Sequence, residues 1–211
     1  IEQHLDEIRN DRQKLHRDLH DDVGATLSSV KAYSEILRRN PDNPVIADLI
    51  SENAAEMIDT LEVIAWATSP QLDHLRELKS RMQKAGAPLC HSHQIHFRLE
   101  SRGLAEDSLV PGEIRQNLFL IFKEAANNII KYANCTTCNI SMRKTGHRLV
   151  MTIRDDGVGM NTQQAKGNGL YNMQYRAKEL SGECIIRTAE GKGTEVKVLI
   201  PFPFKIVEIK K

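Results

Sequence analysis

The chain has 211 residues, which allows one or two domains at roughly 100–200 residues each. Its formal net charge of +1 and hydrophobic content of 40% are ordinary for a globular protein and exclude the strongly basic field of a chain that binds nucleic acid directly. No apolar run in this sequence approaches the roughly 18 residues of a membrane span, and its opening residues predict no signal peptide. We therefore expect a cytoplasmic fragment, attached to a membrane only through a missing N-terminal part.

The first 66 residues carry two apolar stripes with helical spacing. Residues 40–44 (Asn-Pro-Asp-Asn-Pro) interrupt them and predict a turn. A hairpin of two long helices cannot cover both stripes by itself, so we expect a homodimer through residues 1–66 that forms a four-helix bundle. The alternative is a single hairpin resting on the second domain. The stripe residues are Ile8, Leu15, Leu19, Val23, Thr26, Val30, Tyr33 and Leu37, then Ile46, Ile50, Met57, Leu61 and Ile64.

From about residue 70 the pattern changes to a mixture of helices and strands. It predicts, in order, a helix over 72–82, a polar loop over 90–93, a strand over 94–99, a helix over 111–133, strands over 140–143 and 148–154, a helix over 170–180, and strands over 183–188 and 194–200. Without repeated βαβ units, this order indicates an α+β sandwich.

Four cysteines are present, and only Cys135 and Cys138 have the spacing of a metal-binding pair. A zinc site normally needs a second such pair, which the chain lacks. We therefore interpret this pair, and the residues around Cys90, as structural.

His20 lies beside the apolar stripe of the first helix and is followed by Asp21. A carboxylate that holds the Nδ1 proton would leave the Nε2 lone pair free to attack an electrophile. An exposed His in a charged helix is more often an ordinary surface residue, so this motif alone decides little.

Glu124 and Asn128 lie four positions apart in the helix predicted over 111–133, and Lys131 follows three positions later. This spacing places a carboxylate, an amide oxygen and an ammonium group on one helix face. Oxygen ligands and a cation suit Mg²⁺ bound to a polyphosphate. An ordinary exposed helix face is the alternative, although two consecutive Asn residues are unusual inside a helix.

Three glycine-rich segments follow. Residues 155–159 (Asp-Asp-Gly-Val-Gly) close a strand, where glycines let the backbone approach a flat ligand and Asp155 can accept a hydrogen bond from an exocyclic amine. Residues 167–170 (Gly-Asn-Gly-Leu) open a helix, whose free N–H groups suit an anion. Residues 191–194 (Gly-Lys-Gly-Thr) could be part of the same site or only a hairpin turn between two strands. Each segment alone is a weak signal.

Together and in this order, the five segments resemble a bacterial two-component sensor histidine kinase of the nitrate-sensor and membrane-fluidity-sensor subfamily. Residues 20–22 resemble its phosphoacceptor box. Residues 124–133, 155–159 and 167–170 resemble the N, G1 and G2 boxes of the GHKL (Bergerat) ATPase fold, which gyrase, Hsp90 and MutL share.

The resemblance implies a role for each segment. His20 would accept the γ-phosphate of ATP, with Asp21 orienting or deprotonating it and Glu124 at the catalytic face. Asn128 would ligate Mg²⁺ and Lys131 would meet the phosphates. The remaining implied nucleotide-binding residues are Asp155, Gly157, Gly159 and Thr194 around the adenine, and Gly167, Gly169 and Leu170 around the phosphates.

The implied organisation is a dimerisation and phosphotransfer domain (residues 1–68), a linker (69–72) and a catalytic ATP-binding domain (73–211). The implied partner is the receiver domain of a response regulator, which takes the phosphoryl group onto an aspartate. The alternatives are a catalytically degenerate ATP-binding dimer and a serine kinase of the anti-sigma-factor type. A gyrase-like hydrolase is disfavoured because the chain is short and has no transducer domain.

One departure from the subfamily generates a prediction. Many relatives carry Gln four residues after the acid that follows the phosphoacceptor, and this amide is thought to position the water that dephosphorylates the regulator. Here the position is Ala25, which has no hydrogen-bonding side chain. We expect little phosphatase activity in the wild type and a gain in Ala25→Gln, measured as loss of label from a phosphorylated regulator. A fully active wild type that the substitution does not improve would contradict this.

Overall fold

The structure is a computed structural model that describes residues 27–67, 74–159 and 169–201. The chain divides into two compact units near residue 71, and each is described by itself. Within the described ranges, no helix is both long and apolar enough to cross a membrane.

The first unit contains two helical segments. Residues 27–39 are helical, and α2 spans Pro44–Ala67. The Asn43 side chain accepts a hydrogen bond from the Ile46 N–H at 3.3 Å, so Asn43 caps α2, and Pro44 takes the first helical position, where its missing N–H costs nothing. The predicted turn is therefore an N-cap followed by proline. Pairing of the two helices as a hairpin, and its dimerisation, remain predictions.

The second unit begins with α3 (Leu75–Ser92), which is longer than the sequence predicts. The sequence predicts that this helix ends at Met82, before Gly86 and Pro88, two residue types that are unfavourable inside helices. That expectation is wrong. The buried residues continue at helical spacing through Met82, Gly86 and Cys90, while Pro88 is exposed. Burial of this stripe outweighs the intrinsic preference of the two residues.

The expected polar loop over residues 90–93 is likewise mostly the last turn of α3. The helix ends because Gln94 adopts a left-handed conformation with φ 59°. The Ile95 N–H then donates to the Cys90 carbonyl at 2.9 Å, and the Gln94 N–H donates to the His91 carbonyl at 3.0 Å. This is a Schellman C-cap. It uses the residues that we assigned to the start of a strand, so β1 begins two residues later and spans His96–Arg102.

The central helix changes its winding near its end. The single helix predicted over 111–133 is an α-helix α4 (Gly112–Asn128) continued by a π-helix η2 (Ile129–Ala133). Asn134, with φ 46°, ends it in the left-handed conformation. A π-helix has i→i+5 bonding and therefore rotates each residue less about the axis than an α-helix does.

A five-stranded sheet forms the other layer, in the order β1-β2-β3-β5-β4. Strand β1 runs parallel to β2 (Thr137–Thr145) and joins it through α4 and η2, whereas the remaining neighbours are antiparallel. The other strands are β3 (Arg148–Asp155), β4 (Glu183–Thr188) and β5 (Thr194–Pro201). Helix α5 (Gly169–Glu179) lies between β3 and β4 in sequence. The predicted α+β sandwich is confirmed.

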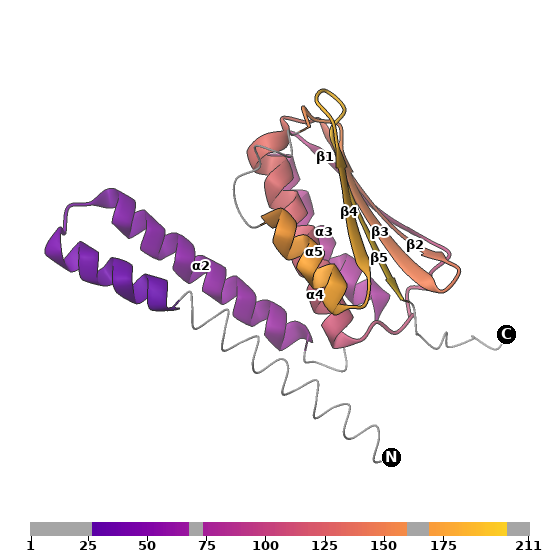
Figure 1. The fold of residues 1–211 in the computed structure, drawn as a ribbon, viewed down its shortest axis with the longest axis horizontal. Helices are drawn as coiled ribbons and strands as arrows, with labels where there is room; N and C mark the ends of the chain where they lie inside the picture. Colours follow the sequence, from indigo (N-terminus) through magenta and orange to yellow (C-terminus); the bar gives the residue numbers. More distant parts are fainter. Residues whose placement is uncertain (1–26, 68–73, 160–168, 202–211) are drawn as a thin grey trace, which may run out of the picture. The chain divides into compact units, whose positions relative to one another are not determined.

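Helices α3, α4 and α5 cover one face of the sheet (Figure 1). The strands alternate accordingly: Ile140, Met151 and Val198 point into the core and are at most 1% exposed. The positions that alternate with these core residues carry polar side chains, which form a row across all five strands. The row consists of Arg98, Asn139, Arg154, Glu195 and Arg187. This two-residue period gives the sheet one buried and one polar face.

Cys90 on α3 and Cys138 on β2 are both buried and form no disulfide. Within the part of the chain that the structure describes, no three His, Cys, Asp or Glu side chains are grouped so that they could hold a metal ion.

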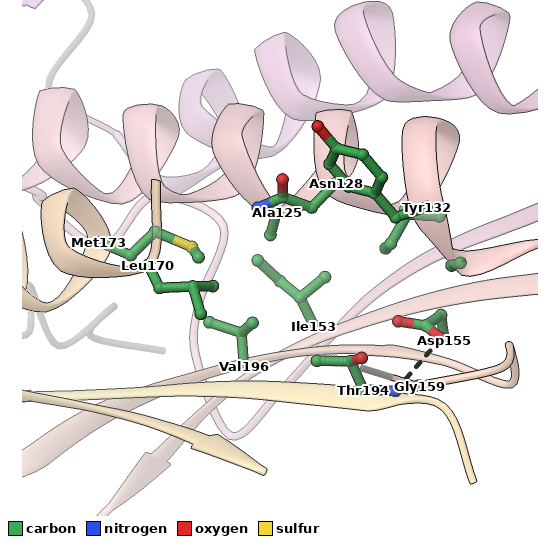
Figure 2. A pocket seen from close by; sticks show the side chains of 12 residues that line it. Ala125, Asn128, Tyr132, Ile153, Asp155, Gly159, Leu170, Met173, Thr194 and Val196 are labelled. Carbon is green, nitrogen blue, oxygen red and sulfur yellow. Dashed lines mark hydrogen bonds between the residues drawn. The ribbon is translucent and has the colours of Figure 1, made fainter. Parts of the chain in front are cut away.

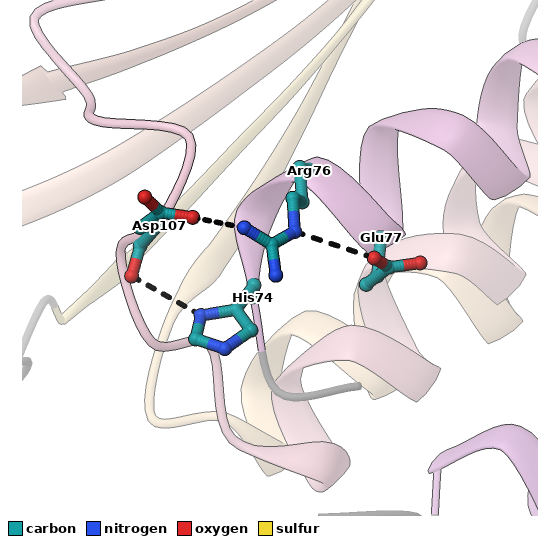
Figure 3. A network of polar contacts seen from close by, with 4 residues as sticks. All are labelled: His74, Arg76, Glu77 and Asp107. Atoms are coloured by element: carbon teal, nitrogen blue, oxygen red, sulfur yellow. Dashed lines mark hydrogen bonds and ion pairs between the residues drawn. The ribbon is translucent and has the colours of Figure 1, made fainter. Parts of the chain in front are cut away.

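A polar network fastens the start of α3 to the loop after β1 (Figure 3). Arg76 forms an ion pair with Asp107, and His74 Nδ1 donates to the Asp107 carbonyl at 3.2 Å. Arg76 also contacts Glu77 at 3.4 Å. These side chains are largely solvent-exposed, so each pair contributes little to stability alone.

Gly86 generates a stability prediction. A Cβ at this position would lie 2.5 Å from Phe97 Cε2 and 2.8 Å from Phe122 Cζ, two rings packed edge to face. Overpacking costs about 1–3 kcal/mol and exceeds the gain of about 1 kcal/mol from placing Ala in a helix. We expect Gly86→Ala to lower the free energy of unfolding, measured in urea. Gln83→Ala, on the exposed face of α3, is the control, and a stabilised Gly86→Ala would contradict the packing.

Candidate nucleotide site

A small pocket opens between the helical layer and the sheet, at the end of β3. Asn128 and Tyr132 reach it from the α4–η2 helix, Leu170 and Met173 from α5, and Asp155 and Thr194 from the sheet side (Figure 2). The other lining residues are Ala125, Ile129, Ala133, Ile153, Gly159 and Val196. The pocket is thus mostly apolar with a few polar groups, as small-molecule sites usually are.

Asp155 is the buried polar group of this pocket, at 3% exposure. Its Oδ1 accepts a hydrogen bond from the Gly157 N–H at 2.9 Å. It also accepts one from the Thr194 N–H at 3.1 Å (Figure 2). Among the described residues, Oδ2 accepts none. Burial raises the pKa of Asp155, and the two N–H donors oppose this shift. A buried carboxylate with one oxygen fixed and the other available suits recognition of an N–H donor.

Three glycines allow the backbone around Asp155 to pack closely. A Cβ on Gly157 would overlap the Ala133 carbonyl, and one on Gly193 would overlap the Asp155 carbonyl. Gly159 and Gly193 also have φ of 71°, which favours glycine. The 191–194 turn, which the sequence left open as a simple turn, is therefore part of the wall of the site.

Glu124 and Asn128 lie together, as their spacing predicts. Asn128 Nδ2 donates to Glu124 Oε1 at 3.3 Å. The first residue of α5, Gly169, lies so close that a Cβ there would overlap Glu124 Oε1. The structure thus brings the start of α5 against Glu124, joining two segments 45 positions apart in the sequence.

Lys131 is placed differently from the expectation of a shared face with Asn128. It lies on η2, is exposed, and is not among the residues that line the pocket. Tyr132 lines the pocket instead, with 64% of its surface exposed. The wider turn of the π-helix explains this, because three residues past Asn128 no longer return to the same face whereas four do.

His20, Asp21, Ala25 and Gly167 lie outside the described residues. Their assignments remain predictions.

The sequence did not identify most of the apolar residues that line the pocket. Helical spacing leads from Asn128 to Ala125 and from Ala125 to Ile129, and strand alternation from Asp155 points to Ile153. These signals were present but do not distinguish a pocket wall from an ordinary core. Met173 could be placed only once α5 was seen to pack beside α4.

Residues 113–204 match the family described as histidine kinase-, DNA gyrase B- and HSP90-like ATPases. The chain is 28% identical over 202 residues to the sensor histidine kinase YvfT of Bacillus subtilis, covering 92% of this chain and 51% of that protein. It is 29% identical to the signal transduction histidine-protein kinase/phosphatase UhpB of Salmonella typhimurium, covering 90% and 38%. The chain thus spans about half or less of the length of these curated relatives.

Among solved structures, the fold resembles the histidine kinase AdeS of Acinetobacter baumannii with a TM-score of 0.58 at 14% identity. The similarity covers 87% of this chain and 98% of that one. At this identity the likeness concerns the fold alone.

The bonding of Asp155 generates a prediction for Asp155→Asn. An Asn Oδ1 can keep both backbone bonds, but an NH₂ group then replaces Oδ2, which accepts no hydrogen bond from any described residue. We expect affinity for a fluorescent ATP analogue to fall about thirtyfold, the equivalent of about 2 kcal/mol for a lost hydrogen bond that leaves two donors facing each other.

The thermal stability of Asp155→Asn should not fall below that of the wild type. Because the folded-state pKa of Asp155 is raised, its charge opposes folding at neutral pH, and this penalty disappears as pH falls through that pKa. The stability gain in Asp155→Asn should therefore be largest near neutrality and vanish in acid. Glu195→Gln, on the polar face of the sheet, is the control. Unchanged nucleotide affinity in Asp155→Asn would contradict the assignment.

Proposed function

We propose that this chain, which is related to sensor histidine kinases and contains their type of ATPase domain, is a kinase core that transfers the γ-phosphate of ATP onto its own His20. The observation that carries the proposal is the buried Asp155 carboxylate at the end of an apolar pocket, with Oδ1 held and Oδ2 available.

In this proposal the adenine ring lies in the apolar part of the pocket, against Ile153 and Val196. The exocyclic amine of adenine donates to Asp155 Oδ2. A ring that is apolar on its faces and carries a donor on its edge matches a pocket of this composition. A purine with a carbonyl at the same position would place an acceptor against the carboxylate and be rejected.

In this proposal the triphosphate extends toward Glu124, Asn128 and the start of α5. The assignment of Gly167, two residues before α5 in the sequence, to the phosphates belongs to the same proposal. Backbone N–H groups at the first residues of α5 suit phosphate oxygens. A side chain at Gly169 would displace the Glu124 carboxylate, so glycine at this position supports a close approach of the α5 backbone to Glu124. Lys131, exposed on η2, would neutralise phosphate charge from the side of the site.

Mg²⁺ fits this end of the site. Because Asn128 donates to Glu124 through Nδ2, its Oδ1 is left to act as a ligand, and Mg²⁺ prefers oxygen ligands shared with phosphates. Asn128 would hold the ion, and Glu124 would fix the orientation of the Asn128 amide. When bound, the ion supplies neutralisation of phosphate charge.

For transfer, His20 Nε2 attacks the γ-phosphorus in line with the leaving oxygen of ADP. The N–P bond forms as the P–O bond breaks, and Asp21 holds the proton on Nδ1. Phosphoryl transfer needs chiefly positioning and charge neutralisation. The helical domain (residues 1–68) would supply His20 and dimerise, the linker (69–72) would let the two domains meet, and residues 73–211 would hold the nucleotide.

The phosphoryl group would then pass from His20 to an aspartate of a response regulator. The names of the relatives support this place in a two-component system. A degenerate ATP-binding dimer, or a serine kinase of the anti-sigma-factor type, would share the nucleotide pocket but would not use His20.

The decisive experiment is incubation with γ-labelled ATP and Mg²⁺, with His20→Ala and Asn128→Ala beside the wild type. We expect acid-labile, alkali-stable label on the wild type and loss of label in both variants. Only Asn128→Ala should also weaken nucleotide binding in the presence of Mg²⁺, measured by titration. Label that persists in His20→Ala, or label on a serine of another protein, would contradict the proposal. Bound ATP without any label would favour the degenerate dimer.

A further inference from the structure

Asp156, the neighbour of Asp155, makes three hydrogen bonds to one short segment. Its Oδ1 accepts from the Thr136 N–H at 2.9 Å and from the Thr137 N–H at 2.8 Å. Its Oδ2 accepts from the Thr136 hydroxyl at 2.6 Å. Asp155 and Asp156 thus bond to different segments. Asp155 holds the start of β5, and Asp156 holds the segment that enters β2.

The segment held by Asp156 is the exit of the π-helix. Chain direction reverses at Asn134, which has φ 46°, and the Thr136 carbonyl accepts from the His96 N–H at 2.8 Å as β2 begins. Just before the reversal, Ala133 lines the pocket, and its carbonyl accepts from the Val158 N–H at 2.7 Å. Two links, one on each side of Gly157, therefore tie the end of η2 to the end of β3.

These links set the separation between two opposite sides of the pocket. One wall consists of Ile129, Tyr132 and Ala133 on η2, and the opposite side holds Asp155. A π-helix is a poorly favoured conformation that persists only where its surroundings hold it. Loss of the Asp156 bonds would leave residues 134–136 held by the backbone bonds of Ala133 and Thr136, and the end of η2 could then move relative to Asp155.

We propose that Asp156 is a positioning residue of the nucleotide site: by fastening Thr136 and Thr137 to the end of β3, it sets the spacing between η2 and Asp155. The inference rests on the proposed function, because the nucleotide is the ligand whose fit it controls. Asp156 does not touch the pocket itself, since it is not among the lining residues.

The charge state of Asp156 agrees with this role. The Thr136 hydroxyl, assisted by the two backbone N–H groups, lowers the pKa of Asp156 to about 2 despite partial desolvation. The carboxylate therefore remains an acceptor for all three bonds across the physiological pH range. Because Asp156 is exposed, each bond competes with water, and the effect of losing them should be moderate.

The test compares three variants with the wild type by titration of a ribose-labelled fluorescent ADP. Asp156→Ala loses all three bonds and should raise Kd about tenfold, a moderate effect because these bonds are exposed to water. Thr136→Val loses only the hydroxyl bond and should raise Kd about threefold. Asp156→Asn keeps an oxygen for both N–H donors and should remain within about threefold of the wild type.

Kinetics and a matched control separate positioning from general loss of stability. In autophosphorylation, KM for ATP should rise by the same factor as Kd, whereas kcat at saturating ATP should not change. Asp107→Ala removes another exposed carboxylate of the same unit, which holds Arg76 at the start of α3 (Figure 3). It should leave Kd unchanged even if it lowers the melting temperature.

Each contrary result has a distinct meaning. Unchanged Kd in Asp156→Ala and Thr136→Val, with a wild type that binds nucleotide, would overturn the inference and leave the proposed function intact. An equal rise in Kd in Asp107→Ala would show that the effect is general destabilisation and would also overturn it. A wild type that binds neither ADP nor ATP would overturn the proposed function and the inference together.

Discussion

One carboxylate oxygen organises the second unit, from α3 to β5. Oδ1 of Asp155 accepts from the backbone of its own turn at Gly157 and from the start of β5 at Thr194, so it holds a loop and a strand 39 positions away to the end of β3. A buried carboxylate is costly, as its raised pKa shows, and two N–H donors offset only part of that cost. The part of this desolvation cost that the two donors do not offset lowers the stability of the fold. Proteins commonly retain such a cost at functional sites.

The rest of the site is arranged around that oxygen by close backbone contacts. Gly157 faces the Ala133 carbonyl, Gly159 faces the Ala189 carbonyl, and Gly193 faces the Asp155 carbonyl. The Gly191 N–H also donates to the Val158 carbonyl at 2.7 Å. Three segments distant in sequence therefore meet through their main chains, where no side chain could be accommodated. Such contacts are less adaptable than side-chain packing, and they give the pocket a defined floor between η2 and β5.

The π-helix decides which side chains of the central helix face this floor. Up to Asn128 the α-helical period holds, and Glu124 and Asn128 meet as their spacing requires. Beyond Asn128 the wider turn brings Tyr132 to the pocket and leaves Lys131 exposed. A proposed role for Lys131 at the phosphates therefore relies on the reach of a long, flexible side chain from outside the lining. Asp156 and the left-handed Asn134 hold the end of this irregular turn, which connects the local geometry of the helix to the pocket that we propose for the nucleotide.

The sequence by itself determined the α+β class, the order of strands and helices in the second unit, and the pairing of Glu124 with Asn128, because these depend on short-range periodicity and on residue types at fixed spacing. It indicated Asp155 and its glycines through the order of the segments. Tertiary structure alone decided that α3 continues through Gly86 and Pro88, because two phenylalanine rings fill the space that Gly86 leaves. It alone placed Tyr132 rather than Lys131 at the pocket, and Thr136 and Thr137 on Asp156. These features depend on contacts between residues distant in the chain, and local propensity contains no information about such contacts.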